Sequence, residues 1–151
     1  MPQTQQPAPP QPMVDNKYGA AGEIMALSQP RLIAILQDKS ASVYARAKAC
    51  QRLAVVGDKS AVPALAALLA DTQLSHYARF GLEPISDPSA GDALRAALAN
   101  LKGNLLIGVI NSIAQRKDAK SVDALARLRH DADAGIARAA DAALARIRPG
   151  M

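Results

Sequence analysis

Aromatic residues are scarce in this 151-residue chain, which has no Trp, one Phe and three Tyr. Half of the residues are nonetheless hydrophobic, so the core must be built from Ala, Leu, Ile and Val. Ala and Leu favour helices, whereas a sheet protein is normally richer in β-branched and aromatic residues. The composition therefore predicts an all-α fold, and the length suits one domain.

Cysteine is almost absent as well. Cys50 is the single cysteine, which excludes an intramolecular disulfide and leaves the redox compartment undetermined. It lies in an apolar helical stretch with no His near it in the sequence. We therefore expect a small buried hydrophobe rather than a reactive thiol.

No apolar run of 18 residues occurs, so no membrane insertion is expected. The amino terminus also lacks the charged and then apolar pattern of a signal peptide. As printed, the chain is expected to be soluble and cytoplasmic. This expectation applies unless a signal peptide, or the rest of a longer parent protein, has been trimmed from the printed sequence. The native compartment and the oligomeric state stay undetermined.

The chain is basic, with 18 Lys and Arg against 13 Asp and Glu and a net charge of +5. This charge is compatible with an acidic partner or with nucleic acid. The cations are spread along the chain and interleaved with acidic residues, whereas a nucleic-acid binder usually concentrates them. The pattern therefore favours a solvated surface.

Motifs of catalysis and of metal binding are missing. The chain has no phosphate-binding loop, no His-Glu-x-x-His pair and no Gly-x-Ser-x-Gly turn. His76 and His130 lie far apart, without Cys or carboxylates at the spacing of a tetrahedral metal site. Asp131 and Asp133 are expected to cap the last helix. The sequence therefore predicts a protein that is not an enzyme and has no metal or cofactor.

Gln and Pro dominate the first 17 residues, and this composition cannot bury apolar surface. Residues 1–17 are therefore predicted to form a disordered tail or linker, and residues 18–148 the folded domain. A binding role for the tail in a proline-recognising groove is a weaker alternative to a flexible tether.

Short apolar segments separated by turn signals follow from Tyr18 onward, and they predict seven to nine helices in pairs. Ser28 and Pro30 mark the start of a helix that reaches Asp38. Its partner spans 42–56 and ends at Gly57, which is expected to adopt a left-handed conformation. The further predicted pairs are 60–70 with 75–85, 89–101 with 104–115, and 121–129 with 134–147.

Two independent markers show that these pairs repeat. Asp58, Asp87 and Asp118 each precede a Leu of an x-x-Ala-Leu segment by seven residues, so the period is 29 and then 31 residues. An apolar residue followed by Ala and Arg also recurs early in the second helix of three pairs. These segments are Tyr44-Ala45-Arg46, Tyr77-Ala78-Arg79 and Ile136-Ala137-Arg138.

The combined pattern resembles HEAT repeats, most closely in residues 59–79 and over roughly 30–147 in all. It is similar to short bacterial HEAT-like units of about thirty residues, including those of the phycobilin-lyase type. The resemblance implies a right-handed α-solenoid of about four short helix pairs, whose second helices form the inner, default binding face. Leu106 departs from the pattern, because it stands where Arg is expected. A tetratricopeptide fold is the weaker alternative, since its Trp, Gly and Tyr positions are missing.

The repeated arginines are the first candidate site residues. Arg46, Arg79 and Arg138 could form a ladder that grips carboxylates or phosphates. The resemblance to HEAT repeats favours a structural role, in which each arginine ties its repeat to an acidic turn. The aspartates expected in those turns are Asp38, Asp71 and Asp131.

Polar side chains of two central second helices are the other candidates. His76, Arg79 and Glu83 share one helical face, and Asn104, Gly108 and Asn111 share the corresponding face of the next second helix. Gly108 within an apolar helix costs about 1 kcal/mol relative to Ala, which indicates close helix packing or, less strongly, room for a ligand. The predicted partner-binding residues are His76, Arg79, Glu83, Asn104, Asn111, Arg46 and Arg138.

The leading functional hypothesis is a non-enzymatic protein–protein interaction module, a scaffold or assembly subunit that binds a protein partner through the inner face. The alternative is nucleic-acid binding, because the chain is basic and some HEAT-like bacterial enzymes act on damaged DNA. It fits less well, since base stacking normally uses aromatic side chains. Those available are Tyr18, Tyr44, Tyr77 and Phe80. A phycobilin-lyase-like activity rests on the repeat resemblance alone.

Overall fold

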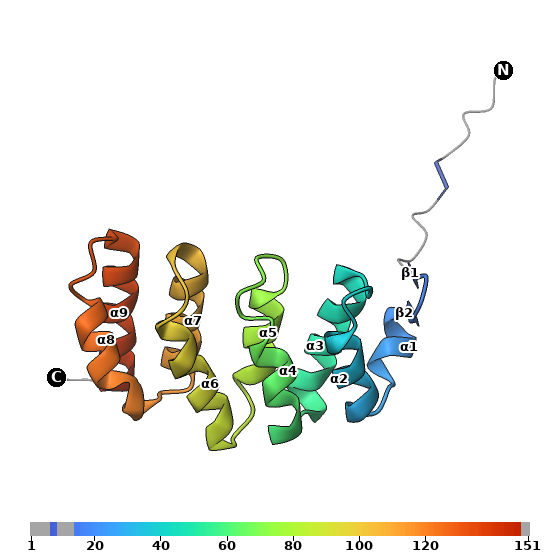
Figure 1. Cartoon of the computed structure of the whole chain (residues 1–151), viewed down its shortest axis with the longest axis horizontal. Helices are drawn as coiled ribbons and strands as arrows, with labels where there is room; N and C mark the ends of the chain where they lie inside the picture. The colour runs from blue at the N-terminus through green and yellow to red at the C-terminus, as the bar shows by residue number, and fades with distance from the viewer. Residues whose placement is uncertain (1–6, 9–13, 149–151) are drawn as a thin grey trace.

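The computed structural model describes residues 7–8 and 14–148 of the chain (Figure 1). These residues are mostly helical, which confirms the predicted all-α class, and the nine α-helices lie at the upper end of the predicted number. The only strands among them are β1 (Val14–Asp15) and β2 (Gly19–Ala20), an antiparallel pair of two residues each.

Four helix pairs follow a short first helix, α1 (Ala21–Met25). The first helices of the pairs are α2 (Gln29–Gln37), α4 (Val62–Ala66), α6 (Pro88–Leu98) and α8 (Val122–Leu128). The second helices are α3 (Val43–Val56), α5 (Ser75–Leu82), α7 (Gly103–Gln115) and α9 (Ala134–Ile147). Two short 3-10 helices, η1 (Lys59–Ala61) and η2 (Ala119–Ser121), precede α4 and α8.

The helices are arranged in two rows. Each first helix packs against the second helix that follows it, and α3, α5, α7 and α9 contact one another in that order (Figure 1). The core lies between the rows. Leu65, Leu94 and Leu125, which mark the repeat in the sequence, are all fully buried in it. The repeated leucine is therefore a packing position of the first helices.

The repeated aspartates begin the repeats by capping backbone N–H groups. Asp58 accepts a hydrogen bond from the Ser60 N–H at 2.8 Å, and Asp87 accepts one from the Ser89 N–H at 2.9 Å. Asp118 does the same for Lys120 at 3.3 Å. A carboxylate at this position satisfies donors that a helix start leaves unpaired, which explains the recurrence of Asp.

Some helix ends differ from the predictions. Gly57 ends α3 as predicted, but its backbone is extended, with φ −71° and ψ 148°, and not left-handed. Glycine is needed there for another reason, because a Cβ atom would overlap the Leu53 carbonyl oxygen that accepts the Gly57 N–H. Ser42 caps α3 by accepting the Ala45 N–H at 3.0 Å, whereas Ser28 makes no such bond to α2.

The folded part begins before the predicted boundary at residue 18. Asp15 is 8% exposed and accepts the backbone N–H groups of Lys17 and Tyr18 at 2.8 and 2.7 Å. The Ser42 hydroxyl also donates to Asp15, and this bond is the main reason that the pKa of Asp15 lies below its ordinary value. Residues 14–17 therefore pack onto the helical domain. The rest of the predicted tail, apart from residues 7–8, lies outside the described residues.

Cys50 is fully buried in α3, as expected for a small hydrophobe. Burial raises the pKa of its thiol to about 12.

In the described part of the chain, the helices do not combine the length and hydropathy that crossing a bilayer requires.

Candidate functional site

The exposed side of α3, α5 and α7 is the surface on which the candidate site residues gather, and we call it the second-helix face. Its side chains follow one another at helical spacing and are exposed or half-buried. The members are Lys48, Gln51 and Val55 on α3, His76, Phe80 and Glu83 at α5, and Asn104, Asn111 and Gln115 on α7.

Arg79 joins α5 to α7 at one edge of this face. Its Nη1 donates hydrogen bonds to the Gly108 carbonyl oxygen at 3.0 Å and to the Ser112 hydroxyl at 3.3 Å. Ser112 in turn donates to the Glu83 carboxylate at 2.7 Å, and the Arg79 Nη2 lies 3.5 Å from the His76 Nδ1. The predicted group of His76, Arg79 and Glu83 is thus brought together with α7.

Gly108 makes room for the Arg79 guanidinium. A Cβ atom at position 108 would lie 2.8 Å from both Cζ and Nε of Arg79, closer than such atoms can approach. A glycine within an apolar helix predicts close helix packing or, less strongly, space for a ligand. The structure gives a third reason, because a side chain of the preceding repeat occupies the space.

The effect of Gly108→Ala on the free energy of unfolding should therefore change sign with the residue at position 79. With Arg79 present, we expect a loss of about 1 kcal/mol, because the displaced guanidinium gives up charged hydrogen bonds that outweigh the better helix propensity of Ala. In an Arg79→Ala background, the same substitution should stabilise the protein by about 1 kcal/mol. Urea unfolding of the four proteins, followed by circular dichroism, measures both effects. The same sign in both backgrounds would contradict this account of Gly108.

Of the three repeated arginines, only Arg79 makes hydrogen bonds to a neighbouring repeat within the described residues. Arg46 lies two residues before Lys48, about 200° around α3, and is therefore off the second-helix face. Its Nε is buried without a hydrogen-bond partner among the described residues. The Arg138 side chain is exposed and makes no hydrogen bond or ion pair with the described part of the chain.

The expected pairing of these arginines with acidic turns is also not observed between described residues. Asp71 instead accepts the N–H groups of Gln73 and Leu74, at 2.8 and 3.0 Å. Asp131 accepts the Asp133 N–H at 2.8 Å. Asp38 accepts hydrogen bonds from Lys17, Tyr18 and Ser40.

Other arginines bridge neighbouring repeats instead. Arg95 on α6 forms ion pairs with Asp92 of its own helix and with Asp118 of the next repeat. The Arg116 guanidinium donates to backbone carbonyl oxygens of the preceding repeat, at 3.0 Å to Glu83 and at 3.3 Å to Leu82. Arg146 on α9 likewise donates to the Gln115 side chain of the preceding repeat at 2.8 Å. These arginines therefore hold neighbouring repeats together.

A shallow groove crosses the second-helix face, and sequence reasoning did not predict it. We call it the second-helix groove; its volume is about 380 Å³. Val55 and Phe80 are 72% and 51% exposed there. The lining residues are Ala54, Val55, Phe80, Glu83, Pro84 and Gln115. The spacing of Phe80 from His76 and Glu83 already placed it on the polar face, and this was the signal that could have identified it.

The second-helix face combines an exposed aromatic ring, an aliphatic side chain, amides, one carboxylate, a lysine and an imidazole. No group of three His, Cys, Asp or Glu side chains in the described ranges, 7–8 and 14–148, could hold a metal ion.

Comparison of the chain with models of known protein families gives no match, and no curated protein sequence matches it.

Proposed function

We propose that this chain is a protein interaction module, built as a right-handed α-solenoid of about four short HEAT-like helix pairs and binding a protein partner through its second-helix face. It performs no chemistry of its own. The observation that carries the proposal is the second-helix groove, in which Phe80 and Val55 stand exposed among polar side chains.

The HEAT-like assignment is supported by equivalent roles of repeated residues. The leucines at 65, 94 and 125 are buried at the same place in successive first helices, and the aspartates at 58, 87 and 118 cap the same turn. Helix pairs that stack in a row bury a continuous core and leave the second helices as a long surface for a partner.

A protein partner suits the groove better than nucleic acid does. Exposed aromatic and aliphatic groups with a polar rim are typical of protein interfaces, where a few buried side chains supply most of the binding energy. Nucleic acid requires cations that are free to meet phosphates. The residues that line the second-helix groove include no Lys or Arg and one carboxylate, that of Glu83.

The groove is also held in place before a partner arrives. The hydrogen bonds from Arg79 to Gly108 and Ser112 and from Ser112 to Glu83 fix α5 against α7. A surface that needs no rearrangement loses less entropy on binding. Phe80 thus stands on a rigid support, which favours selective binding.

Site-specific photocrosslinking tests the proposal. The photoreactive residue p-benzoylphenylalanine is placed at position 80 and, as a matched control, at the exposed Asp123 of α8, in cells that naturally contain the protein. We expect the crosslinker at position 80 to give one predominant protein adduct. The crosslinker at position 123 should not give this adduct, and adding Val55→Asp to the position-80 protein should abolish it. Equal adducts from both positions, or crosslinks to nucleic acid alone, would exclude the second-helix face as a protein site.

A further inference from the structure

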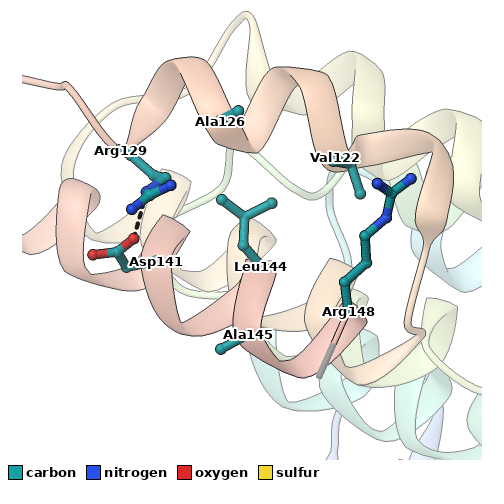
Figure 2. A pocket seen from close by; sticks show the side chains of 7 residues that line it. All are labelled: Val122, Ala126, Arg129, Asp141, Leu144, Ala145 and Arg148. Atoms are coloured by element: carbon teal, nitrogen blue, oxygen red, sulfur yellow. Dashed lines mark ion pairs between the residues drawn. The ribbon is translucent and has the colours of Figure 1, made fainter. Parts of the chain in front are cut away.

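A second groove lies at the carboxyl-terminal end of the helix stack, between α8 and α9, and we call it the end groove (Figure 2). Its volume is about 470 Å³. Val122 and Ala126 of α8 and Leu144 and Ala145 of α9 form its floor. Because two of these residues are alanines, a helix backbone can approach closely.

The ends of the groove are charged. The Arg129 Nε and the Asp141 Oδ1 form an ion pair of 2.5 Å at one end, and Arg148 lies at the other (Figure 2). Arg138 shares the same side of α9, because it precedes Asp141 by three residues and Ala145 by seven. The side chains of Arg138 and Arg148 are exposed and have no partner within the described ranges. Since Arg129 and Asp141 neutralise each other, the lining residues carry one net positive charge, that of Arg148, and Arg138 beside the groove adds a second to this positive rim.

The interior of the stack shows what such an arginine does when another helix covers it. Arg79, in the segment Tyr77-Ala78-Arg79, donates to Gly108 and Ser112 of the next second helix. Arg138 has the same place in Ile136-Ala137-Arg138, but nothing in the described chain follows α9 to accept its hydrogen bonds. Arg138, beside the end groove, is therefore placed to donate to a helix that lies along this side of α9.

We propose that the end groove binds an acidic amphipathic helix of a partner protein. The apolar stripe of that helix covers Ala126, Leu144 and Ala145, and its carboxylates accept charge-assisted hydrogen bonds from Arg138 and Arg148. A second copy of this chain in a symmetric end-to-end pair would bring the same positive rim against itself, which is unfavourable. This site is separate from the second-helix face and does not rest on the proposed function of that face.

The test uses a designed probe, a fluorescein-labelled helical peptide with Leu at positions i, i+4, i+7 and i+11 and Glu beside them, and a control peptide with Lys in place of each Glu. Fluorescence anisotropy with the full chain is expected to give about tenfold tighter binding of the Glu peptide. Ala145→Glu, an exposed change on the groove floor, should weaken its binding at least about tenfold. The matched change Ala142→Glu lies on the same helix outside the groove and should leave the affinity unaltered.

Charge reversal and self-association decide the outcome. The double variant Arg138→Glu, Arg148→Glu should prefer the Lys peptide, and Phe80→Asp, in the other groove, should bind the Glu peptide as the unsubstituted chain does. Equal affinity for both peptides, or unchanged binding by a folded Ala145→Glu protein, would overturn the proposal. A dimer in analytical ultracentrifugation that Ala145→Glu dissociates would also overturn it, because a second copy would then occupy the groove.

Discussion

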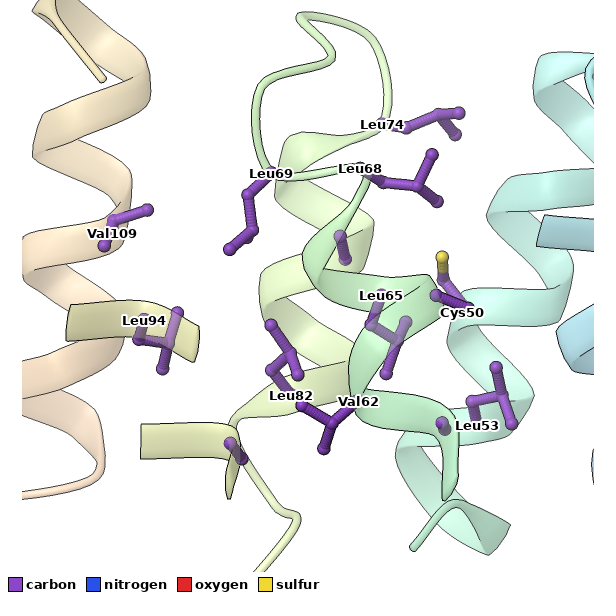
Figure 3. Close-up of a cluster of buried hydrophobic side chains, with 14 of the residues drawn as sticks. Cys50, Leu53, Val62, Leu65, Leu68, Leu69, Leu74, Leu82, Leu94 and Val109 are labelled. Atoms are coloured by element: carbon purple, nitrogen blue, oxygen red, sulfur yellow. The ribbon is translucent and has the colours of Figure 1, made fainter. Parts of the chain in front are cut away.

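The Leu65→Ala variant is expected to lose about 2–5 kcal/mol of unfolding free energy. Leu65 is fully buried on α4, between Cys50 of α3 and Leu82 of α5 (Figure 3). The cost combines the lost burial of the leucine side chain with the cavity that remains. Urea unfolding followed by circular dichroism measures it. Val55→Ala, at a position 72% exposed, is the control and should change stability by less than about 0.5 kcal/mol.

The same site allows a partial rescue. A Cβ atom added to Gly81 would lie 2.9 Å from the Leu65 Cδ2, so Gly81→Ala alone forces the leucine to shift. When Leu65 is already Ala, that contact is gone, the new methyl group occupies part of the cavity, and Ala favours the helix by about 1 kcal/mol. We therefore expect Gly81→Ala to restore about 1 kcal/mol to Leu65→Ala. Simple additivity of the two substitutions would show that Leu65 and Gly81 do not share this space.

Features decided within a few residues were predictable from the sequence. Ser42 caps α3 and Asp58 begins the next repeat because their side chains bond to N–H groups two or three residues away. Leu94 and Leu125 are buried because helical periodicity places them on the apolar side of short amphipathic helices. The all-α class and the pairing of helices follow from such local signals.

Features decided between repeats were not predictable in the same way. Gly108 gives no sign in its own helix of the guanidinium that lies over it, because Arg79 comes from the preceding repeat. Phe80 is the only Phe of the chain, and hydrophobicity alone would bury it. Its 51% exposure depends on where α3 and α7 stand beside α5.

The arginines show how one motif can occupy different environments. Arg46 and Arg79 occupy matching places in the sequence motif, but Arg46 lies off the second-helix face while Arg79 reaches α7. The contacts between repeats also use Arg95 and Arg116, which the motif does not mark. The repeated motif thus marks Arg79 but not Arg95, Arg116 or Arg146, the last of which donates to Gln115 of the preceding repeat.

Asp118→Asn is expected to lower the unfolding free energy at neutral pH by about 2–3 kcal/mol. Asp118 accepts hydrogen bonds from the Arg95 guanidinium, from the Ser121 hydroxyl at 2.7 Å and from the Lys120 N–H at 3.3 Å. Its side chain is 13% exposed, and that of Arg95 is 21% exposed, so solvent screens the pair only partly. The substitution leaves Arg95 without its partner across the repeat boundary. Asp123→Asn, at an exposed position of α8, is the matched control and should be nearly neutral.

The pH dependence of this loss identifies the carboxylate as its cause. Burial raises the pKa of Asp118, but the hydrogen bonds from Ser121 and Arg95 outweigh burial and hold the pKa below its ordinary value. A carboxyl group with a lowered folded pKa stabilises the protein fully above its unfolded pKa of about 3.9, and this contribution disappears as the pH falls through the folded value. The difference between the unsubstituted and Asp118→Asn proteins should therefore stay constant above about pH 5 and shrink below about pH 4. Urea titrations from neutral to acidic pH measure it, and a difference that persists undiminished in acid would mean that packing at position 118, and not the ion pair with Arg95, joins the two repeats.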